Sequence, residues 1–109
     1  MMNQKAYMEL VKGILDIMEE RVVRIVLYGS VARGTSTEES DIDIALLVKG
    51  NLDKDTEDRL SDIIVDLNLK YDKVFSVIDI DYDKFQKWEK VMPFYQNVNR
   101  EGIVLWKAA

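Results

Sequence analysis

The chain has 109 residues, 48% hydrophobic and 32% charged, with a formal net charge of −5. This composition is typical of a folded protein, and we expect residues 1–109 to form a single domain. The lack of cysteine and histidine excludes disulfides, cysteine-based zinc sites and the commonest general base. The negative charge argues against an extended nucleic-acid surface. No apolar run approaches the roughly 20 residues of a membrane span, so we expect a soluble, cytoplasmic protein.

The first predicted elements are a helix and a buried strand. Apolar residues recur at three- and four-residue steps over 4–20, which is a helical period. The β-branched segment 21–28 follows as a largely buried strand. The chain then turns sharply at Gly29-Ser30, and 31–34 is expected to form a short helical turn.

A second strand and a long helix come next. A polar loop, 35–40, leads into a second strand, 42–48, which is apolar on both faces once past Asp43, as expected in the middle of a covered sheet. Asp53 or Asp55 caps a crossover helix that ends near Lys70 and carries its leucines and isoleucines on one face.

The last third of the chain alternates strands and helices. The segment 74–80 is expected to be the third strand, followed by a short helix over 82–91. Pro93 opens another helical turn, 94–100. The segment 103–106 is either a short last strand or an extended tail docked on the core.

This order of elements predicts an α/β or α+β fold with helices packed on a small mixed sheet. The 13-residue connection 29–41 is too short for a parallel crossover with its own helix, so the first two strands are expected to be antiparallel. The third strand, reached through a helix, is expected to be parallel to the second.

Antiparallel pairing of the first two strands brings Gly29-Ser30 beside Asp41 and Asp43. A glycine-bearing turn can place backbone N–H groups against phosphate, and two carboxylates two residues apart point to the same face of a strand. Such carboxylates can bind Mg²⁺, which shares its coordination with substrate phosphates. Arg33 is close enough in sequence to add a positive charge. These residues predict a metal and nucleotide-phosphate site.

The combination of Gly29-Ser30, ten residues, and then Asp41-Ile-Asp43 at the head of an apolar strand resembles the signature of the DNA polymerase beta-like nucleotidyltransferase superfamily. The segments 27–34 and 40–44 look like those of its compact bacterial and archaeal branch, the minimal nucleotidyltransferases. The segment 100–106 is similar to the one with which many of these small proteins end.

The resemblance implies a single nucleotidyltransferase domain that uses Mg²⁺ and a nucleoside triphosphate, ATP in our interpretation, to transfer AMP to a protein partner. Many minimal members act as antitoxins that adenylylate a HEPN-type toxin, and we expect this chain to do the same. In this interpretation Gly29 permits the tight turn, Ser30 and Arg33 bind the triphosphate, and Asp41 and Asp43 hold the metal and are catalytic.

The resemblance also implies a third carboxylate on a neighbouring strand. Asp72, Asp79 and Asp81 are the candidates. If the third strand is parallel to the second, its first residues lie near Asp41 and Asp43, which selects Asp72 as the third catalytic and metal-binding residue. If that strand starts later or is antiparallel, Asp79 replaces it.

Two alternatives stay open. A protein of the same fold could bind nucleotide or neutralise its partner by occlusion, without transfer chemistry. A transferase that modifies small molecules is the other alternative, although 109 residues leave little room for the extra domain that usually forms the acceptor pocket.

Overall fold

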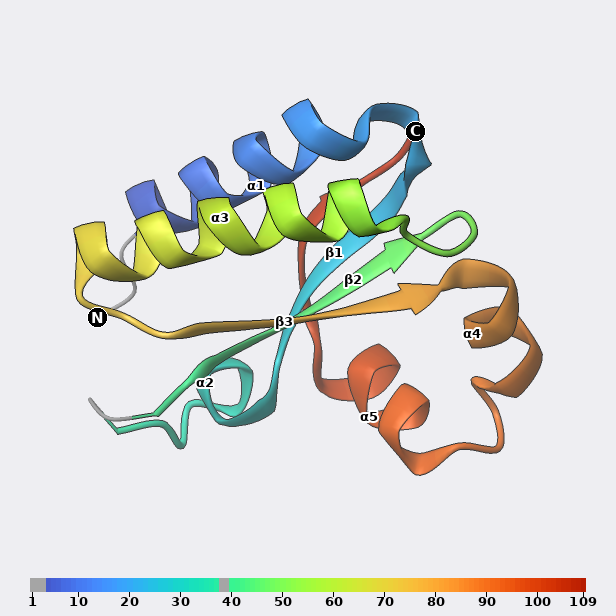
Figure 1. Cartoon of the computed structure of the whole chain (residues 1–109). Coiled ribbons are helices and arrows are strands. Elements are labelled where there is room, and N and C mark those ends of the chain that lie inside the picture. Colours follow the sequence, from blue (N-terminus) through green and yellow to red (C-terminus); the bar gives the residue numbers. More distant parts are fainter. Residues whose placement is uncertain (1–3, 38–39) are drawn as a thin grey trace.

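The structure, a computed structural model, describes residues 4–37 and 40–109. Two long helices, α1 and α3, lie side by side over one face of a sheet, and the shorter helices lie below it (Figure 1). The helices are α1 (Gln4–Met18), α2 (Gly29–Arg33), α3 (Lys54–Tyr71), α4 (Tyr82–Trp88) and α5 (Pro93–Glu101), with a 3-10 turn at Glu19–Arg21. The strands are β1 (Val22–Tyr28), β2 (Ile42–Val48), β3 (Phe75–Asp81) and β4 (Ile103–Lys107).

The four strands form one mixed sheet in the order β3-β2-β1-β4. β1 is antiparallel to both β2 and β4, and β3 is parallel to β2. The predicted mixed fold and both predicted strand orientations are therefore confirmed. The last segment is a true strand rather than a docked tail, because it pairs with β1.

The sheet is buried on both faces, which explains why β2 is apolar from Ile44 to Val48. One set of side chains packs beneath α1 and α3 in what we call the helix-side core, and includes Leu10, Ile14, Ile44, Leu46 and Phe75. The alternate side chains form a second core against α4 and α5, which includes Val26, Ala45, Leu47, Ile80, Phe85 and Tyr95. Successive residues of a strand point to opposite faces, so one strand serves both cores.

The element boundaries differ from the sequence-based expectations by a few residues. The first helix ends at Met18, because Glu19 adopts a positive φ of 52° and a 3-10 turn follows. The helix after β1 begins at Gly29 rather than at residue 31. The long helix is capped by Asp53, whose carboxylate accepts from the Thr56 N–H at 2.8 Å. The third strand begins one residue later than expected, at Phe75.

A surface groove of about 530 Å³ lies between α1 and β4. Its lining is mainly apolar, and the lining residues include Tyr7, Met8, Val11, Leu15 and Leu105. The groove is on the helix-side face of the sheet, whereas the alternation of side chains along β2 places Asp43 on the other face. In the described part of the chain, no helix has both the length and the apolar character needed to cross a membrane.

Candidate active site

The turn at Gly29 and the carboxylate of Asp43 are in direct contact. Tyr28, the last residue of β1, is the cross-strand partner of Asp43 in the antiparallel ladder. Gly29 follows with a φ of +78°, and a Cβ atom placed there would collide with Asp43 Oδ2. Glycine is needed at this position both for its backbone conformation and for the space that the carboxylate occupies. The structure confirms that the turn meets a carboxylate, that of Asp43.

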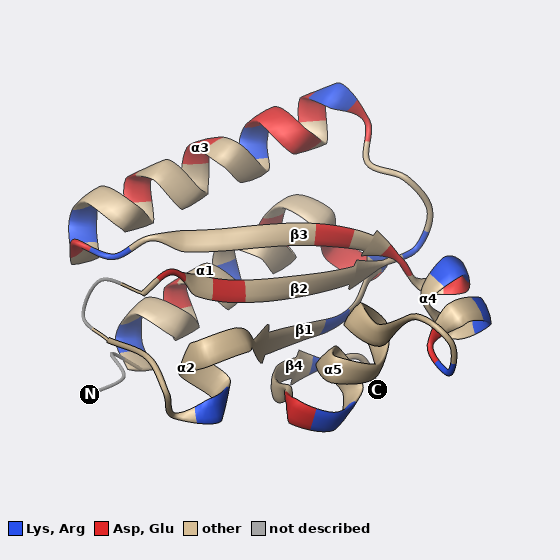
Figure 2. Cartoon of the chain, turned by 90° about the horizontal axis from the view of Figure 1, so that it is seen from below, with Lys and Arg blue, Asp and Glu red and all other residues tan. Residues whose placement is uncertain are grey.

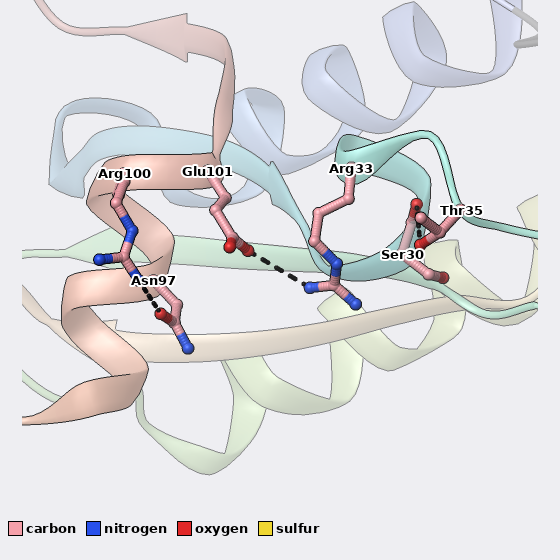
Figure 3. A network of polar contacts seen from close by, with 6 residues as sticks. All are labelled: Ser30, Arg33, Thr35, Asn97, Arg100 and Glu101. Carbon is pink, nitrogen blue, oxygen red and sulfur yellow. Dashed lines mark hydrogen bonds and ion pairs between the residues drawn. The ribbon is translucent and has the colours of Figure 1, made fainter.

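The residues after Gly29 fold back over the same end of the sheet. The carbonyl of Ser30 accepts from the Thr35 N–H at 2.9 Å and from the Thr35 hydroxyl at 3.4 Å. Gly34 ends α2 in the left-handed conformation. These bonds hold Ser30 and Arg33 on a short, tight helix next to β2 (Figure 3).

The pair Asp41 and Asp43 concentrates negative charge at the start of β2. Asp43 is half-buried and Asp41 is exposed. Burial raises the pKa of the Asp43 carboxyl above its ordinary value, the Asp41 charge raises it further, and Arg33 partly offsets this effect. The protein itself therefore leaves the charge of Asp43 incompletely compensated. A bound cation would supply the missing compensation.

This raised pKa predicts how Asp43 affects stability. A carboxyl whose pKa is higher in the folded state binds its proton more tightly there, so its contribution to stability falls as pH rises above about 4. We expect Asp43→Asn to raise Tm at pH 7 by a few degrees at most, since solvent screens a half-exposed group, and the gain should shrink below pH 4. Thermal melts across pH check this, with Asp79→Asn on β3 as the control. A lower Tm at pH 7 would contradict it.

Arg33 forms an ion pair with Glu101 of α5, with 3.3 Å between the guanidinium nitrogen and the carboxylate oxygen. Figure 3 shows the two side chains pointing toward each other from neighbouring helices. The Arg33 and Glu101 side chains are 47% and 33% exposed, so this pair is worth at most about 1 kcal/mol. Arg33 is thus available to a triphosphate at small cost.

We expect Glu101→Gln to strengthen ATP binding about two- to fivefold, because it removes a competitor for Arg33. Arg33→Gln should weaken binding about tenfold or more, since hydrogen bonds between charged groups are the stronger ones. Titration with ATP checks both changes. Arg100→Gln is the matched control for the Arg33 variant. Arg100 lies on α5, the helix of Glu101, and bonds to Asn97 at 2.9 Å instead. Equal effects of the Arg33 and Arg100 variants would contradict a phosphate contact by Arg33.

The structure does not bring Asp72 into a group with Asp41 and Asp43. Within 4–37 and 40–109, no three or more His, Cys, Asp or Glu side chains lie close enough together to hold a metal ion. Asp72 is the left-handed C-cap of α3 and precedes β3, so the choice of Asp72 is corrected. Glu38 and Glu39 lie outside the described residues.

Asp79, the other candidate, is no better placed. It is the partner of Leu46 in the parallel ladder, well along β3 from the Asp43 end. The residue that β3 places beside Asp43 is Ser76. Sequence reasoning missed Ser76 because it considered only carboxylates for this position, and Ser76 carries a neutral hydroxyl.

Tyr28 is a second residue that sequence reasoning left out of the site. Its ring packs edge-on against Phe94 with 5.4 Å between ring centroids, on the same face as Asp43. Burial raises the pKa of its hydroxyl, and the Asp43 charge adds to this. In the sequence, its position directly before Gly29 could have indicated that Tyr28 belongs to the site. The neutral, largely apolar side chain of Tyr28 therefore lies next to Asp43 and lines the site.

The residues present fit a divalent cation. Asp43 on β2 and Asp41, two residues earlier, supply hard oxygen ligands, the donor type that Mg²⁺ prefers. The raised pKa of Asp43 is consistent with a carboxylate whose partner is a cation from outside the chain. Gly29 keeps the space beside this carboxylate free of a side chain.

A mixed sheet with a glycine turn held against paired carboxylates defines a nucleotidyltransferase fold. The sequence pattern of the Nucleotidyltransferase domain family matches residues 11–97, so the chain belongs to this family. A Methanocaldococcus jannaschii protein named "Putative protein adenylyltransferase MJ0604" is 38% identical over 97% of this chain and 100% of its own length. A second protein of that organism, "Putative protein adenylyltransferase MJ0141", is 37% identical over 64% of this chain and 71% of its own length. The chain is a nucleotidyltransferase.

Solved structures of minimal nucleotidyltransferases share the fold. A toxin–antitoxin structure with AMP-PNP matches with a TM-score of 0.62 at 24% identity, over 94% of this chain and 73% of that one. A tri-AMPylated Shewanella oneidensis HEPN toxin in complex with its MNT antitoxin matches with a TM-score of 0.59 at 22% identity, over 98% and 74%. At these identities the likeness shows the fold alone. The resemblance to the minimal nucleotidyltransferases that the sequence indicated is therefore confirmed for the family and the fold.

Proposed function

We propose that this nucleotidyltransferase uses Mg²⁺ and ATP to transfer AMP to a hydroxyl group of a protein partner. The observation that supports the proposal is the contact between the Gly29 turn and Asp43, the turn that would bind phosphate and the carboxylate that would hold the metal. The protein substrate is supported by the 38% identical relative, which is named for protein adenylyltransferase activity and is matched over its whole length.

In the proposed transfer the protein positions the reactants and neutralises charge, and it forms no covalent bond itself. The acceptor oxygen bonds to the α-phosphorus, the bond from that phosphorus to the bridging oxygen breaks, pyrophosphate leaves, and the proton of the acceptor hydroxyl passes to solvent water. Asp41 and Asp43 would hold Mg²⁺, which supplies charge neutralisation for the triphosphate and the leaving pyrophosphate. The Ser30 hydroxyl and Arg33 would orient the triphosphate, and Tyr28 would exclude water from one side of the carboxylates.

We further propose that the partner is a HEPN-type toxin and that the chain is its antitoxin. The support is at the level of fold, through the toxin–antitoxin structures described above. The experiment is intact-mass analysis of the protein that co-purifies with this chain, with and without ATP and Mg²⁺. A gain of one or more AMP groups is expected only with both. An unmodified partner under all conditions would contradict the proposal.

A second candidate function is neutralisation of a partner by occlusion, without transfer. Two observations favour it: no three acidic side chains group together among the described residues, and the apolar groove between α1 and β4 includes Met8, which is 71% exposed. It predicts that the partner stays bound and inhibited without Mg²⁺ or ATP. Loss of inhibition when ATP is withheld would exclude it.

A further inference from the structure

Ser76 lies beside Asp43 on the face of the sheet that carries the site. The two residues are partners in the parallel ladder between β2 and β3, and neighbouring strands are about 4.8 Å apart. The neighbours of Ser76 along the strand, Phe75 and Val77, both pack into the helix-side core. Because side chains alternate along a strand, Ser76 points to the opposite face, together with Asp43 and Ala45.

This makes Ser76 the position on β3 from which a side chain reaches the carboxylate pair. An acidic residue there would complete a group of three with Asp41 and Asp43. The chain has a neutral hydroxyl instead, and among the residues described no other acid completes such a group. Figure 2 views the sheet from this side, where β2 and β3 run next to each other and α3 lies beyond β3.

The number of carboxylates limits the number of cations. One Mg²⁺ with its octahedral shell is satisfied by one or two carboxylates, phosphate oxygens and water. A second ion, about 3.5–4 Å away at the attacking oxygen, needs anionic ligands of its own as well as shared ones, because the two like charges repel. Asp41 and Asp43 can supply the carboxylate ligands of the first ion. To a second ion they offer only oxygens that the first ion also uses.

We propose that the site binds a single divalent cation with the triphosphate, held by Asp41 and Asp43, and that Ser76 occupies the position from which a second cation would take its carboxylate. This inference rests on the proposed function, since it concerns the same site. Ser76→Asp is then expected to create the second cation site. The extra acid would also repel Asp43, so this variant should be less stable than the wild type without metal and should regain stability with it.

The test counts Mn²⁺ ions by electron paramagnetic resonance, with a non-hydrolysable ATP analogue present at one equivalent. We expect one bound Mn²⁺ in the wild-type protein and a spectrum without coupling between ions. Ser76→Asp should bind two, with the spin coupling of a close pair. Ser61→Asp, at an exposed position on α3, is the charge-matched control and should bind one, as should Ser76→Ala, which keeps the volume small.

The outcomes separate this inference from the proposed function. Two coupled ions in the wild-type protein would overturn the inference and leave the function intact, and this measurement does not depend on whether any variant folds. A folded Ser76→Asp variant that still binds one ion would also overturn it. If the wild-type protein binds no Mn²⁺ with the analogue, the proposed function itself fails, and the inference fails with it.

Discussion

Replacing both Asp41 and Asp43 by Asn is expected to reduce transfer of label from α-phosphate-labelled ATP by roughly 10³-fold or more, equal to about 4 kcal/mol of transition-state stabilisation. Asp43 lies against the Gly29 turn, and among the described residues no group of three or more acids could hold a metal ion in place of this pair. The measurement is label incorporation into the co-purified partner. Unchanged labelling would exclude a catalytic role for both residues.

The control for this double variant must match its change in charge. Asp58→Asn with Asp62→Asn removes the same two charges from exposed positions on α3 and should leave labelling unchanged. Folding of the site variant should survive, because Asn keeps the shape of Asp and the removal of adjacent negative charges is not destabilising here. Circular dichroism and Tm establish this before activity is compared.

Gly29→Ala is expected to lower transfer about 100-fold and to destabilise the protein more than the same change at another glycine of similar conformation. The new Cβ would collide with the Asp43 carboxylate, so either the turn or the carboxylate must move. A displacement of about 1 Å at a reacting centre costs about that factor in rate. Labelling of the partner and the free energy of unfolding are measured together.

Gly50→Ala separates the collision from backbone strain. Gly50 has a φ of +76°, almost the same as the +78° of Gly29, but a Cβ there would meet nothing within 4 Å. Its substitution should cost only the left-handed strain of about 1–2 kcal/mol and leave the rate unchanged. If both alanine variants lose the same stability and retain full activity, the close contact between Gly29 and Asp43 has no role in transfer.

The local parts of the fold follow from the sequence with small errors at the boundaries. The strand 42–48 was predicted to the residue, because an apolar run between a polar loop and Gly50 has sharp ends. The strand orientations followed from the connections between the strands. A short connection forbids a parallel crossover, whereas a connection with a long helix permits one. The predicted helix at 82–91 ends early, at Trp88, where nothing in the local pattern marked a stop.

The register between β2 and β3 could not be predicted. The ladder pairs Asp43 with Ser76, and a slip of one residue in this register would turn every side chain of β3 to the other face. The observed register places Ser76 beside Asp43 and Asp79 beside Leu46, whereas Asp72 precedes β3 as the C-cap of α3. Register depends on how the whole strand packs between two cores, which no short segment encodes.

The sequence by itself determined the chemistry available to this protein. Without histidine or cysteine, and with Gly29, Ser30, Asp41 and Asp43 at this spacing, metal-assisted phosphate chemistry was the reaction class the residues suited best. Only the tertiary structure decided how complete the site is, because a third ligand must come from another strand, and its identity depends on long-range packing. The structure places Ser76 there, and the two carboxylates at the Gly29 turn stand as a pair.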